Sequence, residues 1–331
     1  MKKKGMDILV TLLPSFPHFA QFAVNKHLAG IRLNSAMLKG VDVDEELALL
    51  PKTPVVPLYF DIKGRQLRVT EVHDNPDALD ISLNHPISVQ TPTPVLFKGG
   101  EDDALLAEVL EGGYRLRFHG GPRYLVKAGE SLHIRDASLE VGGDQFVPQE
   151  LEKIEKVKRA GIVRWFLSYV ESQRDVDEFL ELVGKDAEVM LKIESKKGLE
   201  YVAREFKKRD NLTLVAAKGD MYVELDRPHH ILEAQKLIIA HDPQAVAGSR
   251  MMLSVINKVP EIVKGPDGRG EQIAWKIVPN SVPSNADFEQ VAWLYDIGYR
   301  GFMLCDELCL RGDLLTPATN ALRAFKSSYA A

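Results

Sequence analysis

Nine polar side chains end or directly follow short apolar runs of the sequence, at regular intervals. They are Arg32, Asn34, Asp61, Ser168, Lys192, Glu194, Asp220, Ser249 and Glu307. Two carboxylates about one strand–helix repeat apart, Glu194 and Asp220, suit Mg²⁺ or Mn²⁺, which keep coordination positions open for phosphate or carboxylate. Two cations, Arg32 and Lys192, would balance anionic oxygens. The combination predicts a site for a small, doubly anionic carboxylate or phosphate.

The segment from Ala217 to Asp220 adds backbone donors to this set. If it begins a short helix, the N–H groups at Gly219 and Asp220 are available to a carboxylate. Taken singly, each of these residues has a plainer interpretation, such as a solvated Lys–Glu pair or a turn. Their recurrence at equivalent positions of consecutive repeats favours a functional site.

Eight short apolar runs must position these side chains. They are 7–12, 28–33, 55–60, 161–167, 187–193, 212–216, 245–248 and 300–304. Continuous rather than alternating apolar runs are typical of parallel strands buried on both faces. Stretches with helical periodicity lie between them, for example 174–183, 198–208 and 287–295. We expect a closed (β/α)₈ TIM barrel, an α/β fold, with an open doubly wound sheet as the alternative.

One long gap interrupts this alternation. Residues 64–146 show short, partly alternating segments separated by Gly-Gly, Asn-Pro and Pro-rich turns. We therefore expect a barrel of residues 1–63 and 147–331 with a small β-rich domain, 64–146, inserted after the third strand. An insertion there would cover the C-terminal face of the barrel, where active sites lie, so we interpret it as a lid. A purely structural appendage is the alternative.

Composition excludes several classes of function. The chain of 331 residues has 42 Lys and Arg against 47 Asp and Glu, a net charge of −5, which argues against a nucleic-acid-binding face. No run approaches the ~20 apolar residues of a membrane span. Two cysteines, Cys305 and Cys309, cannot form a disulfide framework and are expected to be buried thiols. We expect a cytoplasmic globular protein with a small-molecule substrate. Whether the protein forms a homo-oligomer stays open.

Seven segments, in order along the chain, resemble motifs of the pyruvate kinase family. MDILVTLLPS is similar to its first strand and turn, GIRLN to the motif RLN, and FDIKGRQLR to DTKGPEIR. MLKIESKKGL is similar to the signature SKIENxxG and VAAKGDMYVEL to VARGDLGVE. AGSRMML and VAWLYDIGYRGFMLCDE resemble the motifs of the last two strands. The resemblance implies a barrel of the phosphoenolpyruvate/pyruvate type and an enzyme that transfers a phosphoryl group.

The resemblance also implies roles for individual residues. Lys192 would stabilise the transferring phosphoryl group, and Arg32 would hold the phosphate. Glu194 and Asp220 would bind Mg²⁺ or Mn²⁺, and the amides at Gly219 and Asp220 would bind the pyruvate carboxylate. Three further polar residues are expected to line the substrate site: Asn34, Asp61 and Ser168. Ser249 replaces the threonine near the methylene carbon of the enolate.

Other positions depart from the family. Two potassium ligands, a serine and a threonine, become Ala36 and Ile62, so we do not expect potassium to bind; Arg65 could fill its place. The nucleotide-binding histidine is replaced by Met37, and the arginine that ends the motif ASFVR is Glu171. After residue 331 no sequence corresponds to the C-terminal regulatory domain of pyruvate kinases, so we do not expect effector regulation of the usual kind. Residues 258–279 are extra sequence that suits either a partner-binding loop or a tolerated insertion.

Three functions remain open from the sequence. The first is transfer of a phosphoryl group between phosphoenolpyruvate and a nucleotide, ADP or ATP. The second is a metal-dependent reaction of the pyruvate enolate without a nucleotide, such as an aldolase, lyase or decarboxylase reaction, by analogy with related barrels. The third is a non-catalytic regulatory homologue.

Overall fold

The computed structural model describes residues 5–38, 42–51, 55–227, 229–248, 250–264 and 271–329. Ser249 lies outside these residues, so the structure says nothing of its role. Eight parallel strands form a closed barrel in the order β1-β18-β15-β14-β13-β12-β3-β2. They are β1 (Asp7–Thr11), β2 (Gly30–Asn34), β3 (Leu58–Ile62), β12 (Arg164–Leu167), β13 (Glu188–Ile193), β14 (Leu212–Ala217), β15 (Val246–Gly248) and β18 (Gly301–Met303). The eight strands expected from the apolar runs and the TIM barrel are confirmed.

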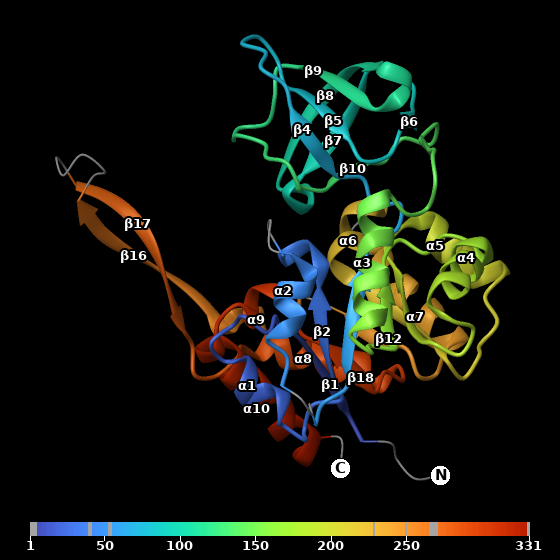
Figure 1. Ribbon diagram of the computed structural model, residues 1–331. Coiled ribbons are helices and arrows are strands. Elements are labelled where there is room, and N and C mark those ends of the chain that lie inside the picture. Colours follow the sequence, from blue (N-terminus) through green and yellow to red (C-terminus); the bar gives the residue numbers. More distant parts are fainter. Residues whose placement is uncertain are drawn as a thin grey trace.

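Helices pack around the barrel (Figure 1). They are α1 (Phe19–Ala23), α2 (Val43–Ala48), α3 (Pro148–Arg159), α4 (Gln173–Val183), α5 (Lys196–Arg204), α6 (Lys218–Glu224), α7 (His230–His241), α8 (Asn285–Asp296), α9 (Asp306–Cys309) and α10 (Gly312–Ser328). Serine side chains cap α4, α5 and α8 by accepting a backbone N–H of the first turn, which fixes where each helix begins. No described helix is long and apolar enough to cross a membrane.

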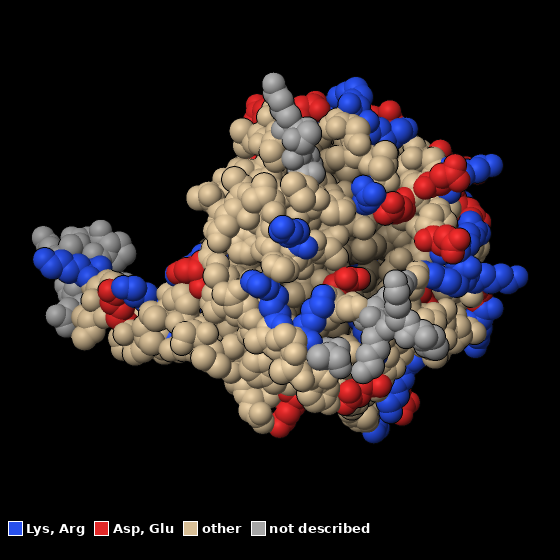
Figure 2. Space-filling view, turned by 90° about the horizontal axis from the view of Figure 1, so that it is seen from below, with Lys and Arg blue, Asp and Glu red and all other residues tan. Residues whose placement is uncertain are grey.

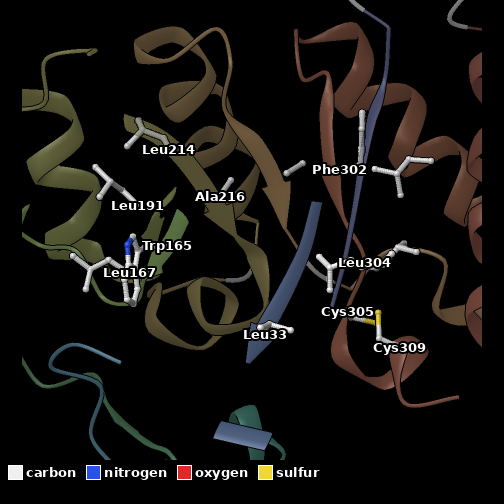
Figure 3. Packing of buried hydrophobic residues seen from close by; sticks show 14 of the residues in the cluster. Leu33, Trp165, Leu167, Leu191, Leu214, Ala216, Phe302, Leu304, Cys305 and Cys309 are labelled. Atoms are coloured by element: carbon white, nitrogen blue, oxygen red, sulfur yellow. The ribbon is translucent and has the colours of Figure 1, made fainter. Parts of the chain in front are cut away.

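Large apolar side chains fill the space between the strands and the helices (Figure 3). Trp165 of β12 is fully buried and packs edge-on against Phe179 of α4, with ring centroids 5.8 Å apart. Leu191 and Leu214 continue the same layer from neighbouring strands. Because these strands are buried on both faces, polar groups can be placed only near their ends.

Cys305 and Cys309 belong to this core. Both are free thiols and both are buried. The Sγ atom of Cys309 accepts a hydrogen bond from the backbone N–H of Thr11 at 3.2 Å, which ties α9 to β1. The expectation of buried structural thiols is therefore confirmed.

A separate six-stranded antiparallel sheet lies between β3 and α3 in the sequence, in the order β10-β7-β8-β9-β5-β4. Its strands are β4 (Val69–Val72), β5 (Asp80–Leu83), β7 (Thr93–Phe97), β8 (Asp102–Leu110), β9 (Arg115–His119) and β10 (Leu132–Ile134), and β6 (Ile87–Ser88) pairs with β11 (Glu140–Val141). The sheet has its own apolar core and stands over the barrel (Figure 1). We call it the lid sheet; the domain limits 64–146 stay a prediction.

The chain passes from the barrel to the lid sheet at Gly64, where there is no space for a side chain. A Cβ atom at this position would lie 2.7 Å from the backbone oxygen of Ser168, closer than real Cβ atoms come to backbone. Glycine is therefore required where the chain leaves the barrel beside β12.

Two long strands, β16 (Ile256–Lys264) and β17 (Glu271–Pro279), form an antiparallel ribbon that projects from the barrel (Figure 1). The extra sequence 258–279 falls on this ribbon, which we call the arm, except for residues 265–270, which lie outside the described residues. It lies between β15 and α8 in the sequence.

Candidate active site

Arg32 on β2 links three neighbouring elements at the end of the barrel. Its Nε atom donates to Asp61 Oδ2 on β3 at 2.7 Å, and its Nη1 atom donates to Asp306 Oδ1 at the start of α9 at 2.8 Å. The Nη1 atom also donates to the Thr11 hydroxyl at 3.1 Å. The planar guanidinium suits this fork, and the pKa of Arg32 lies above its ordinary value because the two carboxylates outweigh burial.

Asp61 is the anion around which the cations of the site gather. Lys63 Nζ donates to its Oδ2 atom at 2.8 Å, and the Ser168 hydroxyl donates to Oδ1 at 3.1 Å. Lys192 Nζ lies 3.7 Å from the same carboxylate. Burial alone would raise the pKa of Asp61, but Lys192, Lys63 and Arg32 outweigh it and hold the pKa well below its ordinary value.

Lys192 and Glu194 lie at the end of β13, both buried. Lys192 Nζ donates to Ser168 Oγ at 3.0 Å and lies 2.8 Å from Glu194 Oε1. The backbone N–H of Tyr169 donates to the other Glu194 oxygen at 2.8 Å. Burial disfavours the charged lysine, but Asp61 and Glu194 raise its pKa above the ordinary value, so the ammonium stays charged.

Asp220 lies in the first turn of α6, one strand–helix unit after Glu194, and its carboxyl group lies against that of Glu194. Burial and the nearby Asp220 raise the pKa of Glu194 to about 7, although Lys192 opposes the shift. The pKa of Asp220 is lowered, because His133 and the hydrogen bond with Glu194 outweigh its burial. The two shifts are opposite in direction, so Glu194 is the carboxyl group of the pair that takes up a proton more readily.

These two carboxyl groups are the residues of the site that could hold a divalent cation. Glu194 Oε1 is buried, and despite its ion pair with Lys192 it has no partner with hydrogen-bond geometry. Mg²⁺ binds one or two carboxylates and fills its other positions with water and substrate oxygens. In the described part of the chain no group of three His, Cys, Asp or Glu residues could hold a metal. The protein would therefore supply two carboxylate ligands, and other ligands would come from solvent or substrate.

The lid sheet contributes one histidine to the site. His133 Nδ1, on β10, lies 2.6 Å from Glu224 Oε1 on α6, and its Nε2 atom lies 3.8 Å from Asp220 Oδ1. The Tyr169 hydroxyl lies 3.2 Å from both His133 Nδ1 and Glu224 Oε1. Tyr169 has a φ of 53°, a strained left-handed conformation that places its N–H on Glu194 and its hydroxyl at the lid.

A cavity of about 370 Å³ lies beside this contact, between the lid sheet and the barrel. Apolar side chains of the lid line one wall, including Leu132 and Ile134. Charged barrel residues, including Glu171 and Lys197, line the opposite wall. The volume is in the range of small-molecule sites in proteins.

The structure brings most of the predicted residues together. Seven form one connected group: Arg32, Asn34, Asp61, Ser168, Lys192, Glu194 and Asp220. Asn34 joins through its Nδ2 atom, which donates to Asp306 Oδ2 at 2.7 Å. Gly219 lies in the first turn of α6, as expected for a backbone donor.

Two expectations need correction. The carboxylate after the eighth strand that contacts Arg32 and Asn34 is Asp306, one position before Glu307, because Asp306 begins α9 facing the site. Arg65 does not take the place beside Asp61: its Nη1 atom donates to the Gly143 carbonyl at 2.7 Å. Lys63 pairs with Asp61 instead.

Sequence reasoning missed four groups of the site: Thr11, Lys63, His133 and Tyr169. Lys63 could have been found, because it follows Asp61 within the motif FDIKG. His133 carried no such signal, because its role depends on how the lid sheet packs on α6.

A comparison with curated proteins finds a pyruvate kinase of Methanocaldococcus jannaschii that is 24% identical over 245 residues. The match covers 70% of this chain and 53% of the relative, so the chain spans about half the length of that protein. No protein-family model matches the sequence. The similarity supports, at the level of distant homology, a relationship between this TIM-barrel chain and pyruvate kinases.

Proposed function

We propose that this chain is a pyruvate kinase-like enzyme that acts on phosphoenolpyruvate or pyruvate with a divalent metal and transfers a phosphoryl group with a nucleotide. The observation that carries the proposal is the position of the Lys192 ammonium, within 2.8 Å of Glu194 and beside the Glu194–Asp220 pair. A fixed cation next to two metal-binding carboxylates suits a substrate that carries both a phosphate and a carboxylate.

The protein's own groups would mainly position the substrate and neutralise its negative charge. In phosphoryl transfer the transition state spreads negative charge over the transferred oxygens, and catalysis consists largely of orientation and charge stabilisation. The cations Lys192 and Arg32 would neutralise that negative charge, and both are oriented by acidic partners rather than free to rotate. Such preorganised charges cost no rearrangement at the moment of reaction.

A Mg²⁺ or Mn²⁺ ion held by Glu194 and Asp220 would act as a Lewis acid on the substrate oxygens. Since a metal ligand must be deprotonated, metal binding would compete with protonation of Glu194, whose pKa is raised to about 7. The backbone N–H of Tyr169 already fixes one Glu194 oxygen and leaves the other facing Lys192.

Potassium is not part of the proposal. The two remaining ligands of the family's potassium site, Asn34 and Asp61, both have protein partners. Asn34 Oδ1 accepts the Ala36 N–H at 3.1 Å, and Asp61 accepts from Arg32, Lys63 and Ser168. These contacts support activity that does not depend on potassium.

One observation favours the second candidate, a reaction of the pyruvate enolate without a nucleotide. Met37, which stands where the family has a nucleotide-binding histidine, is partly buried and packs against the barrel core. An apolar side chain committed to packing gives a nucleotide no polar contact. The enolate side of the site does not depend on this position.

Two assays separate the candidates. Phosphoenolpyruvate, ADP and Mg²⁺ coupled to a pyruvate-consuming reaction report phosphoryl transfer, with and without potassium. Exchange of the pyruvate methyl hydrogens for deuterium, with Mn²⁺ and no nucleotide, reports enolate formation. Turnover in the first assay supports the proposal, and exchange without turnover supports the second candidate. If both assays give no signal, the non-catalytic alternative is favoured.

A matched pair of variants tests the role of Lys192. Lys192→Met removes the buried ammonium, and we expect a loss of roughly 100-fold or more, as for other removed transition-state donors. Lys158→Met removes a surface lysine of α3 that pairs with Glu155 at 3.0 Å, and should keep activity within about twofold. Equal activity of the two variants would contradict the assigned role.

A further inference from the structure

The arm exposes an apolar face along its length. In its register Pro260 pairs with Trp275 and Ile262 pairs with Ile273, so these four side chains lie on the same face of the ribbon. Trp275, Ile262 and Ile273 are 65%, 69% and 71% exposed. A two-stranded ribbon alone in water is marginally stable, and this one projects from the barrel (Figure 1). An apolar face of this kind marks an interaction site.

The base of the arm is held firmly. Arg311 Nη1 donates to the carbonyl of Ile277 at 3.1 Å. Asn280 donates from its backbone to Val255 at 2.9 Å and from its side chain to Ser254 at 2.7 Å. These contacts fix the direction in which the arm leaves the barrel, so the apolar face is presented in a defined orientation.

A hollow of about 650 Å³ lies at the foot of the arm. Its lining is mostly apolar or uncharged and includes Pro279, Val282, Phe288, Thr316 and Ala321, with Asp313 the one charged lining residue. Val282, beside it, is 69% exposed. The surface that joins the arm to the barrel is largely free of charged side chains (Figure 2).

We propose that the arm of one chain packs into the hollow of a second copy, and that the second arm does the same in return, forming a two-fold symmetric dimer. An apolar projection and an apolar hollow on one surface are the two halves of a self-complementary contact. The exposed area of the three arm side chains is on the order of 300–400 Å². Because each copy would contribute one arm and one hollow, the two reciprocal contacts would together bury on the order of 1,000 Å², about the least that a specific interface needs.

The first test measures the mass of the full chain by sedimentation equilibrium across a range of concentrations. The proposal expects a dimer for the unaltered chain. Trp275→Glu should raise the dissociation constant by roughly 30-fold or more, as for other central aromatic contacts. Lys276→Glu, the next position and on the opposite face of the arm, should leave the constant unchanged. Thermal unfolding verifies that both variants are folded.

The second test distinguishes arm-to-hollow packing from arm-to-arm packing. Val282→Glu alters the hollow and leaves the arm intact, so it should be monomeric alone. Mixed with Trp275→Glu, it should form a heterodimer, because one intact arm then meets one intact hollow. A monomeric unaltered chain, a dimer that survives Trp275→Glu, or a Val282→Glu chain that still dimerises would each overturn the proposal.

Discussion

His133 of the lid sheet and Glu224 of α6 bring Nδ1 within 2.6 Å of Oε1, with both side chains largely removed from solvent. Arg135, two positions on, donates from Nε to the carbonyl of Val223. The lid sheet therefore contacts the barrel through the same helix that carries Asp220 in its first turn. α6 therefore connects the lid contact at Glu224 with the carboxylate of Asp220.

His133→Phe should loosen the lid. The phenyl ring keeps the bulk but leaves Glu224 and the Tyr169 hydroxyl without their histidine partner, a loss of about 1–3 kcal/mol for buried polar groups. We expect faster hydrogen exchange in β10 and α6, read by mass spectrometry, with the barrel strands unchanged. His119→Phe, an exposed position on the lid strand β9, which does not pair with β10, is the control. Equal exchange in β10 for both variants would show that the contact does not hold the lid.

Arg32→Met should destabilise the whole barrel. It leaves Asp61 without one of its cations and Asp306 without its arginine, and breaking a buried pair costs about 3–5 kcal/mol. Urea unfolding at neutral pH measures the loss. Arg164→Met, which breaks a half-exposed pair with Glu188, should cost less than about 1 kcal/mol. Comparable losses would mean that the Arg32 network adds little to stability.

Glu194→Gln should change how stability depends on pH. The pKa of Glu194 is raised from 4.5 to about 7, so the folded state holds a proton that the unfolded state releases between these values. Stability of the unaltered chain should therefore fall as pH rises through this window and level off above pH 7, by on the order of 3 kcal/mol.

Glutamine copies the protonated carboxyl and does not titrate. The variant should melt at a higher temperature than the unaltered chain at pH 8, and the two should converge near pH 4.5. Mn²⁺ should raise the melting temperature of the unaltered chain more than that of the variant. A constant gap across the pH range would contradict the raised pKa of Glu194.

The two cysteines should resist thiol reagents in the folded protein. Burial raises the pKa of both the Cys305 and the Cys309 thiols, so little thiolate is present, and neither side chain is exposed. Ellman's reagent should detect two thiols quickly in denaturant and react only slowly without it. Rapid reaction of one thiol in the native protein would place α9 outside the packed core.

The barrel could be predicted because strands that are buried on both faces consist of nearly continuous apolar runs in the sequence. Runs such as 187–193 and 212–216 contain apolar residues in succession, and both became strands. Lys192 and Glu194, at the end of the first of these runs, could be found for the same reason, since polar groups are conspicuous at the limits of an apolar run.

The remaining site residues depend on contacts that no local pattern records. Asp306 rather than Glu307 meets Arg32 because of the way α9 begins after β18. His133 lies in an ordinary lid strand, and only the packing of that strand on α6 makes it part of the site. Local spacing cannot distinguish such residues from their neighbours.

The insertion of the lid sheet between two paired barrel strands has a consequence for folding. Phe60 of β3 pairs with Trp165 of β12, so the barrel cannot close until the chain on either side of the whole lid comes together. The entropy lost on closing a loop grows with its length. The lid sheet has its own core, and if it folds first it brings its two ends close together and shortens the effective loop. The lid would then serve as a nucleus that makes closure of the surrounding barrel faster.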